Sequence, residues 1–293
     1  MPQKTSYRRG RSAAVLAMFG LSAFGLLPCA AAQDLLAESG PLSAMPGMHE
    51  TGADLIWAVP EGASAGVSGY ATLNFRLAMP FTLSTSATVD SVVVFGYQQG
   101  AIAGPTIDFL GVEVWNGRPG SPGSTKVAGD AAVDGLTSSE FANAYVALSG
   151  VTFANDRPVY ALTAGNLGWS LQAGEYWLVW SMDGVLDGGP YSPYLGDDTR
   201  PVIGDAMQQF LGAWRPARTS TDSGTQVALP LQVYGQASCG ADCDGDGSLT
   251  IFDYLCFQNA FNAGDPDADC DGDGEVTAAD FACFQSRFMS GCP

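Results

Sequence analysis

"DCDGDGSLTIFD" (242–253) and "DCDGDGEVTAAD" (269–280) are two copies of one acidic phrase, and they decide the architecture of the C-terminal end of the chain. The longer segments 242–264 and 269–291 align without a gap and match at 13 of 23 positions. A repeat of this kind is a supersecondary unit that needs its neighbour to bury a core. We therefore expect two equivalent halves that pack against each other.

Each copy places side-chain oxygens at alternate positions before a sharp turn. Aspartates occupy positions 1, 3, 5 and 12 of each loop, and position 6 is Gly247 or Gly274. A hard cation such as Ca²⁺ takes six to eight oxygen ligands, and glycine permits the turn that wraps the chain around it. Position 7 would supply only its backbone carbonyl, so its side chain is free to differ. The spacing predicts two Ca²⁺ sites, one formed by Asp242, Asp244, Asp246, Ser248 and Asp253 and one by Asp269, Asp271, Asp273, Glu275 and Asp280.

A short amphipathic helix is expected after each loop, over "IFDYLCFQNAF" (251–261) and "AADFACFQSRF" (278–288). Apolar residues recur there at the three- and four-residue spacing of one helix face. Two such helices bury only a small aromatic seam, so about 55 residues need metal or disulfides as well. The apolar faces are expected to consist of Phe252, Leu255, Cys256 and Phe261 in the first helix and Phe281, Phe284 and Phe288 in the second.

Six cysteines crowd into the same C-terminal segment, whereas residues 33–238 contain none. An even number of cysteines in a short segment indicates disulfides and an oxidising compartment. We expect a terminal clasp between Cys239 and Cys292. The four inner cysteines keep all three pairings open. Cysteine ligation of a metal is disfavoured because the segment has no CxxC pair and no histidine. The inner cysteines are Cys243, Cys256, Cys270 and Cys283.

Duplicated loops closed by aspartate and followed by helices resemble dockerin modules. The cysteine-bearing form, "ADCDGDG…DYLCFQNAF…DCDGDG…DFACFQSRF" ending at "GCP", is similar to the GC-type dockerin domains at the C-termini of bacterial exported proteins. The resemblance covers roughly 239–293 and implies two bound Ca²⁺ and docking to a surface or scaffold protein.

Dockerins that bind cohesin do so through loop positions 10 and 11, which are often a Ser/Thr pair. Here those positions are Ile251-Phe252 and Ala278-Ala279, so the resemblance carries the calcium chemistry over better than the cohesin partner. A calcium-stabilised cap without any partner is the alternative that the sequence leaves open.

The net charge and the N-terminal segment indicate which partners and which cellular location to expect. The chain has 30 acidic and 12 basic side chains, a net charge of −18 that disfavours nucleic acid and anionic membranes as partners. A basic start, an apolar stretch over 12–27 and Ala30-Ala31-Ala32 before Gln33 predict a signal peptide over 1–32. We therefore expect a secreted or cell-surface protein with no membrane span in its mature form.

Residues 33–236 read as a mainly β domain, and 237–293 as the small helical module. Many short β-forming runs separated by Gly, Pro, Asn and Asp predict a jelly-roll-like β-sandwich, with one short helix near 206–214. The expected strands lie at 91–97, 110–115, 144–153, 158–164, 174–181 and 225–235.

No catalytic residue is assigned in this domain. "GASAG" around Ser64 lacks a later histidine, because the only histidine is His49. The aromatic residues of this domain favour carbohydrate as the ligand class if their faces are exposed, and a packed aromatic core is the alternative. The loop 187–200 (Tyr191, Tyr194, Asp197 and Asp198) is a further ligand or calcium candidate, with an ordinary surface loop as its alternative. The alternative to a non-enzymatic surface protein is a polysaccharide-degrading glycoside hydrolase that uses Glu113 and Glu175 as its carboxylate pair.

Overall fold

The computed structural model describes most of the chain after the expected signal peptide. Residues 1–32, on which that expectation falls, lie outside the described residues, as do short internal gaps. Within the described part, no helix is long and apolar enough to cross a bilayer. The described residues are 33–42, 45–57, 66–101, 104–147, 157–195, 203–219, 224–238, 240–245, 248–271 and 273–291.

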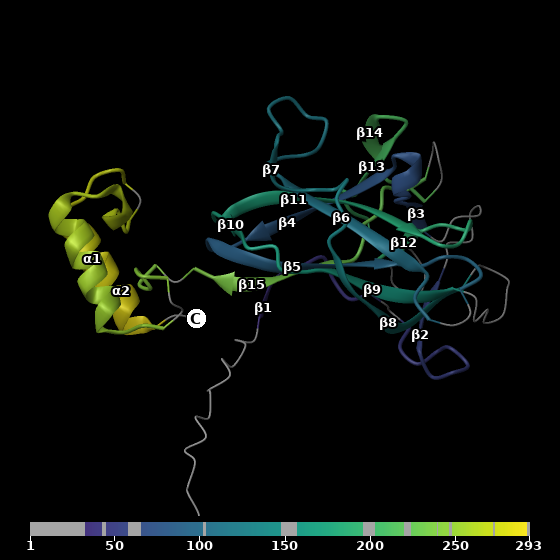
Figure 1. The fold of residues 1–293 in the computed structure, drawn as a ribbon, viewed down its shortest axis with the longest axis horizontal. Coiled ribbons are helices and arrows are strands. Elements are labelled where there is room, and N and C mark those ends of the chain that lie inside the picture. The colour runs from purple at the N-terminus through teal and green to yellow at the C-terminus, as the bar shows by residue number, and fades with distance from the viewer. Residues whose placement is uncertain are drawn as a thin grey trace, which may run out of the picture. The chain divides into compact units, whose positions relative to one another are not determined.

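Residues 33–237 are mainly β, as predicted, and form two large sheets and one small one (Figure 1). One large sheet has the order β1-β15-β5-β9-β8-β2, with β10 paired to β5. These strands are β1 (Asp34–Glu38), β2 (Asp54–Trp57), β5 (Ala87–Gly96), β8 (Leu136–Ala147), β9 (Pro158–Ala164), β10 (Trp169–Leu171) and β15 (Leu231–Ala237).

The second large sheet has six strands in the order β14-β13-β4-β11-β6-β7, and β12 pairs with β3 in a two-stranded ribbon. A single-turn helix, η1 (Ala71–Leu73), precedes β4. The strands are β3 (Gly66–Ser68), β4 (Arg76–Leu83), β6 (Ile107–Trp115), β7 (Lys126–Asp130), β11 (Gly174–Gly184), β12 (Tyr191–Pro193), β13 (Met207–Phe210) and β14 (Ala213–Pro216).

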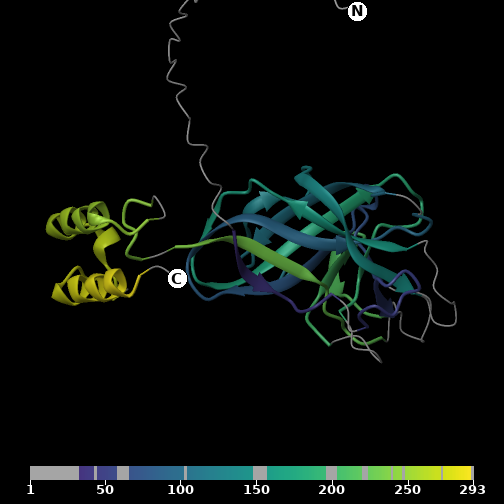
Figure 2. The same cartoon turned by 90° about the horizontal axis from the view of Figure 1, so that it is seen from below.

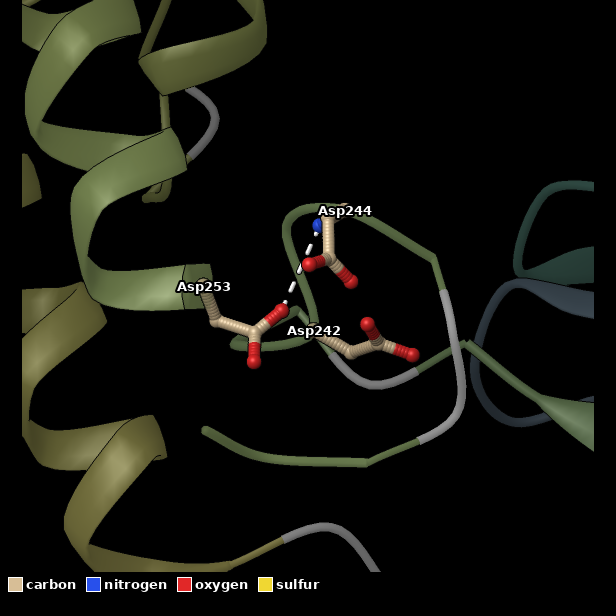
Figure 3. Close-up of side chains that lie close together, drawn as sticks. All are labelled: Asp242, Asp244 and Asp253. Atoms are coloured by element: carbon tan, nitrogen blue, oxygen red, sulfur yellow. Dashed lines mark hydrogen bonds between the residues drawn. The ribbon is translucent and has the colours of Figure 1, made fainter. Parts of the chain in front are cut away.

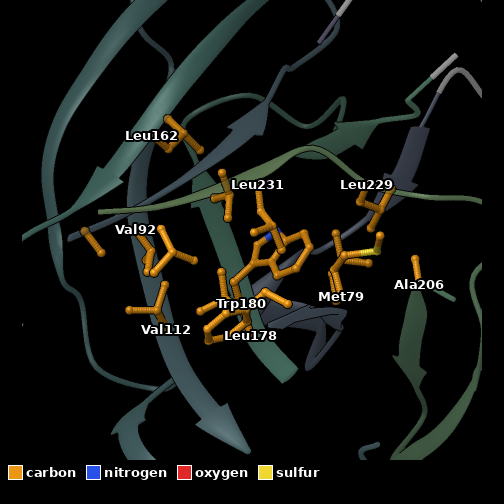
Figure 4. Close-up of a cluster of buried hydrophobic side chains, with 14 of the residues drawn as sticks. Met79, Val92, Val112, Leu162, Leu178, Trp180, Ala206, Leu229 and Leu231 are labelled. Carbon is orange, nitrogen blue, oxygen red and sulfur yellow. The ribbon is translucent and has the colours of Figure 1, made fainter. Parts of the chain in front are cut away.

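The two large sheets share one hydrophobic core, because alternate residues of their strands point between them (Figure 4). Val92 on β5, Leu162 on β9 and Leu231 on β15 come from one sheet, and Leu178 and Trp180 on β11 come from the other. Trp180 is fully buried in this core. Trp177, three residues earlier, belongs to a separate cluster, as expected of residues on opposite strand faces.

The segment 206–214 is a β-hairpin, so the helix predicted there is wrong. Strands β13 and β14 pair through a two-residue turn in which Leu211 has φ 51° and Gly212 has φ 85°. Left-handed conformations at both turn residues are the geometry that matches the twist of a tight hairpin. A non-glycine residue at the first turn position hid this turn from the sequence pattern.

Two helices follow the β strands, and the C-terminal module has its own small core. Helix α1 (Ile251–Ala263) and helix α2 (Ala278–Ser290) lie side by side in Figures 1 and 2, with η2 (Pro266–Ala268) between them in sequence. Phe257 and Phe284 occupy equivalent places in the two repeats and stack at 4.0 Å between ring centroids. The two halves therefore complete each other's core, as the repeat predicts.

The apolar face expected for α2 is confirmed, and the one expected for α1 is wrong in part. Phe281, Phe284 and Phe288 all lie in the module's core. On α1 the core residues are Tyr254, Phe257, Ala260 and Phe261, while Phe252 is 66% and Leu255 46% exposed. Thr250 caps the helix and turns Asp253 inward, which rotates Phe252 and Leu255 toward solvent.

Candidate metal centres in the acidic loops

The first loop brings three of its predicted ligands together. Ligand oxygens of Asp242, Asp244 and Asp253 lie within 4.8 Å of one another, so loop positions 1, 3 and 12 converge (Figure 3). The backbone N–H of Gly245 donates to Asp242 Oδ1 at 2.9 Å and fixes the direction of that carboxylate. Ser248 is exposed, and the position-5 residue, Asp246, lies outside the described residues.

The second loop gathers a different subset of the same positions. Ligand oxygens of Asp269, Asp271 and Asp273 lie within 4.8 Å of one another, which brings positions 1, 3 and 5 together. Backbone N–H groups orient them: Gly274 donates to Asp269 Oδ2 at 2.8 Å, and Glu275 donates to Asp273 Oδ1 at 2.8 Å. The side chain of Glu275 is exposed, which fits a position expected to offer only its carbonyl.

The position-12 aspartates are fully buried at the first turn of each helix. Asp253 Oδ1 accepts from the backbone N–H of Asp244 at 3.3 Å, and Asp280 Oδ1 accepts from that of Asp271 at 3.1 Å. Their Oδ2 atoms accept from the N–H of Thr250 and Thr277, both at 2.7 Å, which completes a capping box at each helix. Each aspartate thus ties its loop to the start of its helix.

These hydrogen bonds keep the buried carboxyls ionised. Burial alone would raise the pKa of Asp253, but N–H donors from Thr250 and Asp244 outweigh it and hold that pKa below its ordinary value. For Asp280, the N–H groups of Thr277 and then Asp271 lower the pKa. Both carboxylates are therefore negative at neutral pH, the state in which they attract a cation.

Two disulfides join each loop to its own helix. Cys243 pairs with Cys256, and Cys270 pairs with Cys283, each across 13 residues. Of the three pairings that the sequence left open, this is the one that stays within each repeat. The expected clasp between Cys239 and Cys292 falls on residues outside the described part of the chain.

The donors in both clusters fit a hard divalent cation. Every grouped ligand atom is a carboxylate oxygen, and the four inner cysteines are consumed by disulfides. Soft metals prefer thiolate or imidazole, whereas oxygen-only sets suit Ca²⁺ and Mg²⁺. The two clusters could therefore hold two metal ions, and their chemistry is compatible with Ca²⁺.

Glu113 and Glu175, the catalytic pair of the alternative hypothesis, are not brought together. Glu113 lies opposite Val179 in the β6–β11 pairing, and Glu175 lies four residues before Val179. That separation is roughly 13 Å along a strand. Glycosidases hold their two carboxyls about 5 to 9.5 Å apart. Glu113 is also 1% exposed and bonded to Arg76, so it does not face a substrate.

The loop 187–200 is only partly described, and its described part is packed rather than open. Tyr194 is 3% exposed and belongs to the main core, so it is not available to stack on a ligand. Tyr191 belongs to β12 and packs against Tyr97 at 5.6 Å between ring centroids. Asp197 and Asp198 lie outside the described residues.

Two sets of residues were missed by sequence reasoning. Thr250 and Thr277 cap the helices and bond the position-12 aspartates, a role that the sequence analysis did not assign to them. The S/T-x-x-D spacing before each helix was the signal that could have found them. The ion-paired group around Glu113 was also missed, although a single acid inside the apolar run "LGVEVW" (110–115) marks it.

Comparisons of the chain with family models, with curated proteins and with solved structures found no match.

Proposed function

We propose that residues 237–293 form a dockerin-like module that binds two Ca²⁺ and attaches the β domain to a surface or scaffold component of the cell that exports it. The observation that supports this most directly is the pair of all-oxygen clusters, each tied to a capped helix by a buried aspartate. The two disulfides support export, because such bonds persist in oxidising compartments. The proposal treats the preceding sandwich as jelly-roll-like and non-enzymatic.

Bound Ca²⁺ would stabilise the folded C-terminal module by neutralising its acidic side chains. The tail carries ten aspartates and one glutamate against the single base Arg287, so like charges repel wherever a cation does not neutralise them. Asp242, Asp244 and Asp253 would hold one ion, and Asp269, Asp271 and Asp273 the other, with carbonyls and water completing each shell.

An exposed apolar pair on α1 supports docking through this helix. Ile251 is 63% and Phe252 66% exposed at the start of α1, next to the first loop. The equivalent residues of α2 are Ala278 and Ala279, so the two halves present different surfaces. A partner that contacts α1 would therefore distinguish the two halves, and one with an apolar groove flanked by basic residues would match both the pair and the acidic loops beside it.

Calorimetric titration of the oxidised full chain with Ca²⁺ tests the first half of the proposal. Two bound ions per chain are expected, with Mg²⁺ a weak competitor. Binding of no ion would contradict the metal assignment.

Surface retention tests the attachment. In the parent cells, the full chain should remain at the surface and be released by EDTA, whereas a chain that ends at Ala237 should appear in the medium. Equal release of both chains without EDTA would favour a cap that has no partner.

A further inference from the structure

A small pocket lies on the face of the six-stranded sheet that points away from the main core. Its volume is about 160 Å³, and it is lined by Arg76 of β4, Phe109 of β6 and Ser181 of β11. The other lining residues are Ala71 of η1, Asn74 and Phe75 after it, and Ala131 with its neighbour. We call this the Arg76 pocket.

The polar side of the Arg76 pocket is held in place by bonds behind it. Arg76 Nη1 donates to Glu113 Oε1 at 3.2 Å. Glu113 in turn accepts from Trp115 Nε1 at 2.8 Å and from the backbone N–H of Ala131 at 3.0 Å. The buried Ser181 hydroxyl donates to the carbonyl of Ala131 at 2.6 Å and holds that backbone in place. The buried carboxylate of Glu113 thus fixes both the Arg76 guanidinium and the backbone at Ala131.

Donors remain in this arrangement after its internal bonds are made. Arg76 carries five N–H donors. Within the described part of the chain, its guanidinium makes one hydrogen bond, from Nη1 to Glu113. The exposed amide of Asn74 makes no side-chain hydrogen bond within the described part of the chain, and its backbone is held at φ 57°. The Arg76 pocket is therefore lined by hydrogen-bonding groups that are not all used within the protein.

The apolar side is equally well supported. Phe75 stacks on Phe210 with 4.8 Å between ring centroids, and the guanidinium of Arg215 lies 4.1 Å above the Phe210 ring. These contacts fix the plane of Phe75 before any ligand arrives. Phe109, Ala131 and Ala132 are further apolar residues that line the pocket.

The ion-paired charges beside the pocket are balanced. Arg76 and Lys126 carry two positive charges, and Glu113 and Asp130 carry two negative ones, linked by ion pairs of 3.2 to 3.8 Å. An anionic ligand would find Arg76, the positive side chain among the lining residues, already paired with Glu113, in a chain whose net charge is −18. A cation would find no accessible carboxylate among the lining residues, because Glu113 is buried behind Arg76. A neutral ligand that is rich in hydroxyl groups matches this environment best.

We infer that the Arg76 pocket binds a single neutral sugar ring, such as the terminal unit of a glycan. A cavity of about 150 Å³ accepts one benzene ring, so a pocket of about 160 Å³ admits one sugar ring at most. The C–H face of the sugar would pack on Phe75 and Phe109, and its hydroxyls would bond to Arg76 and Asn74. This inference extends the proposed function to the β domain and does not depend on the calcium loops.

Saturation-transfer NMR and calorimetry with the Ca²⁺-loaded full chain test it, with methyl glycosides of glucose, galactose, mannose and N-acetylglucosamine as neutral probes and glucuronic acid as an anionic one. At least one neutral glycoside should bind saturably, and glucuronic acid should bind at least tenfold more weakly. Arg76→Lys keeps the charge beside Glu113 but loses the planar fork of donors, and Asn74→Gly keeps the left-handed backbone but loses the amide. Each should weaken binding at least fivefold.

Asn166→Gly is the matched control, because Asn166 is also exposed and has φ 58° but lies outside the pocket. It should leave the affinity unchanged. Sugar binding that Asn74→Gly and Arg76→Lys do not alter would overturn the pocket while leaving a sugar-binding β domain. Absence of binding by every neutral glycoside, or preference for glucuronic acid, would overturn the inference itself. Two bound Ca²⁺ in the same samples would show that the calcium proposal stands separately.

Discussion

In the C-terminal module, one aspartate of each repeat connects the acidic loop to the start of the following helix. Asp253→Asn and Asp280→Asn each remove the negative charge predicted to ligate at loop position 12 and one acceptor of a buried capping box. Because site affinity follows the number of charged ligands, each change should weaken one of the two Ca²⁺ sites by about tenfold or more and leave the other nearly intact. Calorimetric titration of each variant measures this directly.

Asp267→Asn is the control for these changes. It removes the same charge from an exposed residue between the loops, which belongs to neither cluster. Two unchanged sites are expected. If Asp267→Asn weakened binding as much as Asp253→Asn does, general acidity rather than ligation would explain the affinity.

Two phenylalanines on α1 should differ sharply in their effect on stability. Phe257→Ala removes a ring that is 4% exposed and stacked on Phe284, and such truncations cost about 3 to 5 kcal/mol. Phe252→Ala changes an exposed side chain and should alter the unfolding free energy by less than about 0.5 kcal/mol. Urea unfolding followed by helix circular dichroism compares them. Equal losses would mean that α1 packs through the other face.

At the scale of elements, the sequence predicted those structures that local spacing determines. The 158–164 strand was placed correctly, and the α2 face follows from Phe281, Phe284 and Phe288. The α1 face was misassigned because the segment 251–261 has apolar residues on more than one side of the helix, so its sequence is compatible with two different buried faces. Alignment of the repeats resolves the choice, since Phe252 corresponds to Ala279 and Phe257 to Phe284. The hairpin at β13–β14 was missed because its turn begins with leucine.

Each disulfide should stabilise its own loop–helix unit. Replacing Cys243 and Cys256 together by serine opens a closure of 13 residues, which corresponds to about 3 kcal/mol in the chain-entropy model. The first Ca²⁺ site should weaken, because the covalent link that holds the loop against its helix is lost. The matched change at Cys270 and Cys283 should weaken the second site instead. Calcium titration of both variants would contradict this if the two affinities fell together.

At the scale of the whole molecule, composition predicted two parts with different means of stabilisation. Cysteine and acidic residues are concentrated after residue 238, and this pattern anticipated the disulfides and the oxygen clusters. The order of strands in the sheets could not be derived in the same way. It brings β15 beside β5 and β1, and such long-range pairing depends on the packing of the complete core rather than on local spacing.

The β domain and the C-terminal module can be followed separately, by tryptophan fluorescence and by helix circular dichroism respectively. All six tryptophans precede residue 238, whereas both α-helices of the described residues follow it. EDTA should therefore lower the melting temperature seen by circular dichroism at 222 nm and leave the tryptophan fluorescence transition unchanged. Reduction with dithiothreitol should act in the same direction, because residues 33–238 contain no cysteine. A fluorescence transition that fell with the helix signal would mean that the β domain draws stability from the ion-binding module, and an unchanged helix signal would refute the structural role of the metal.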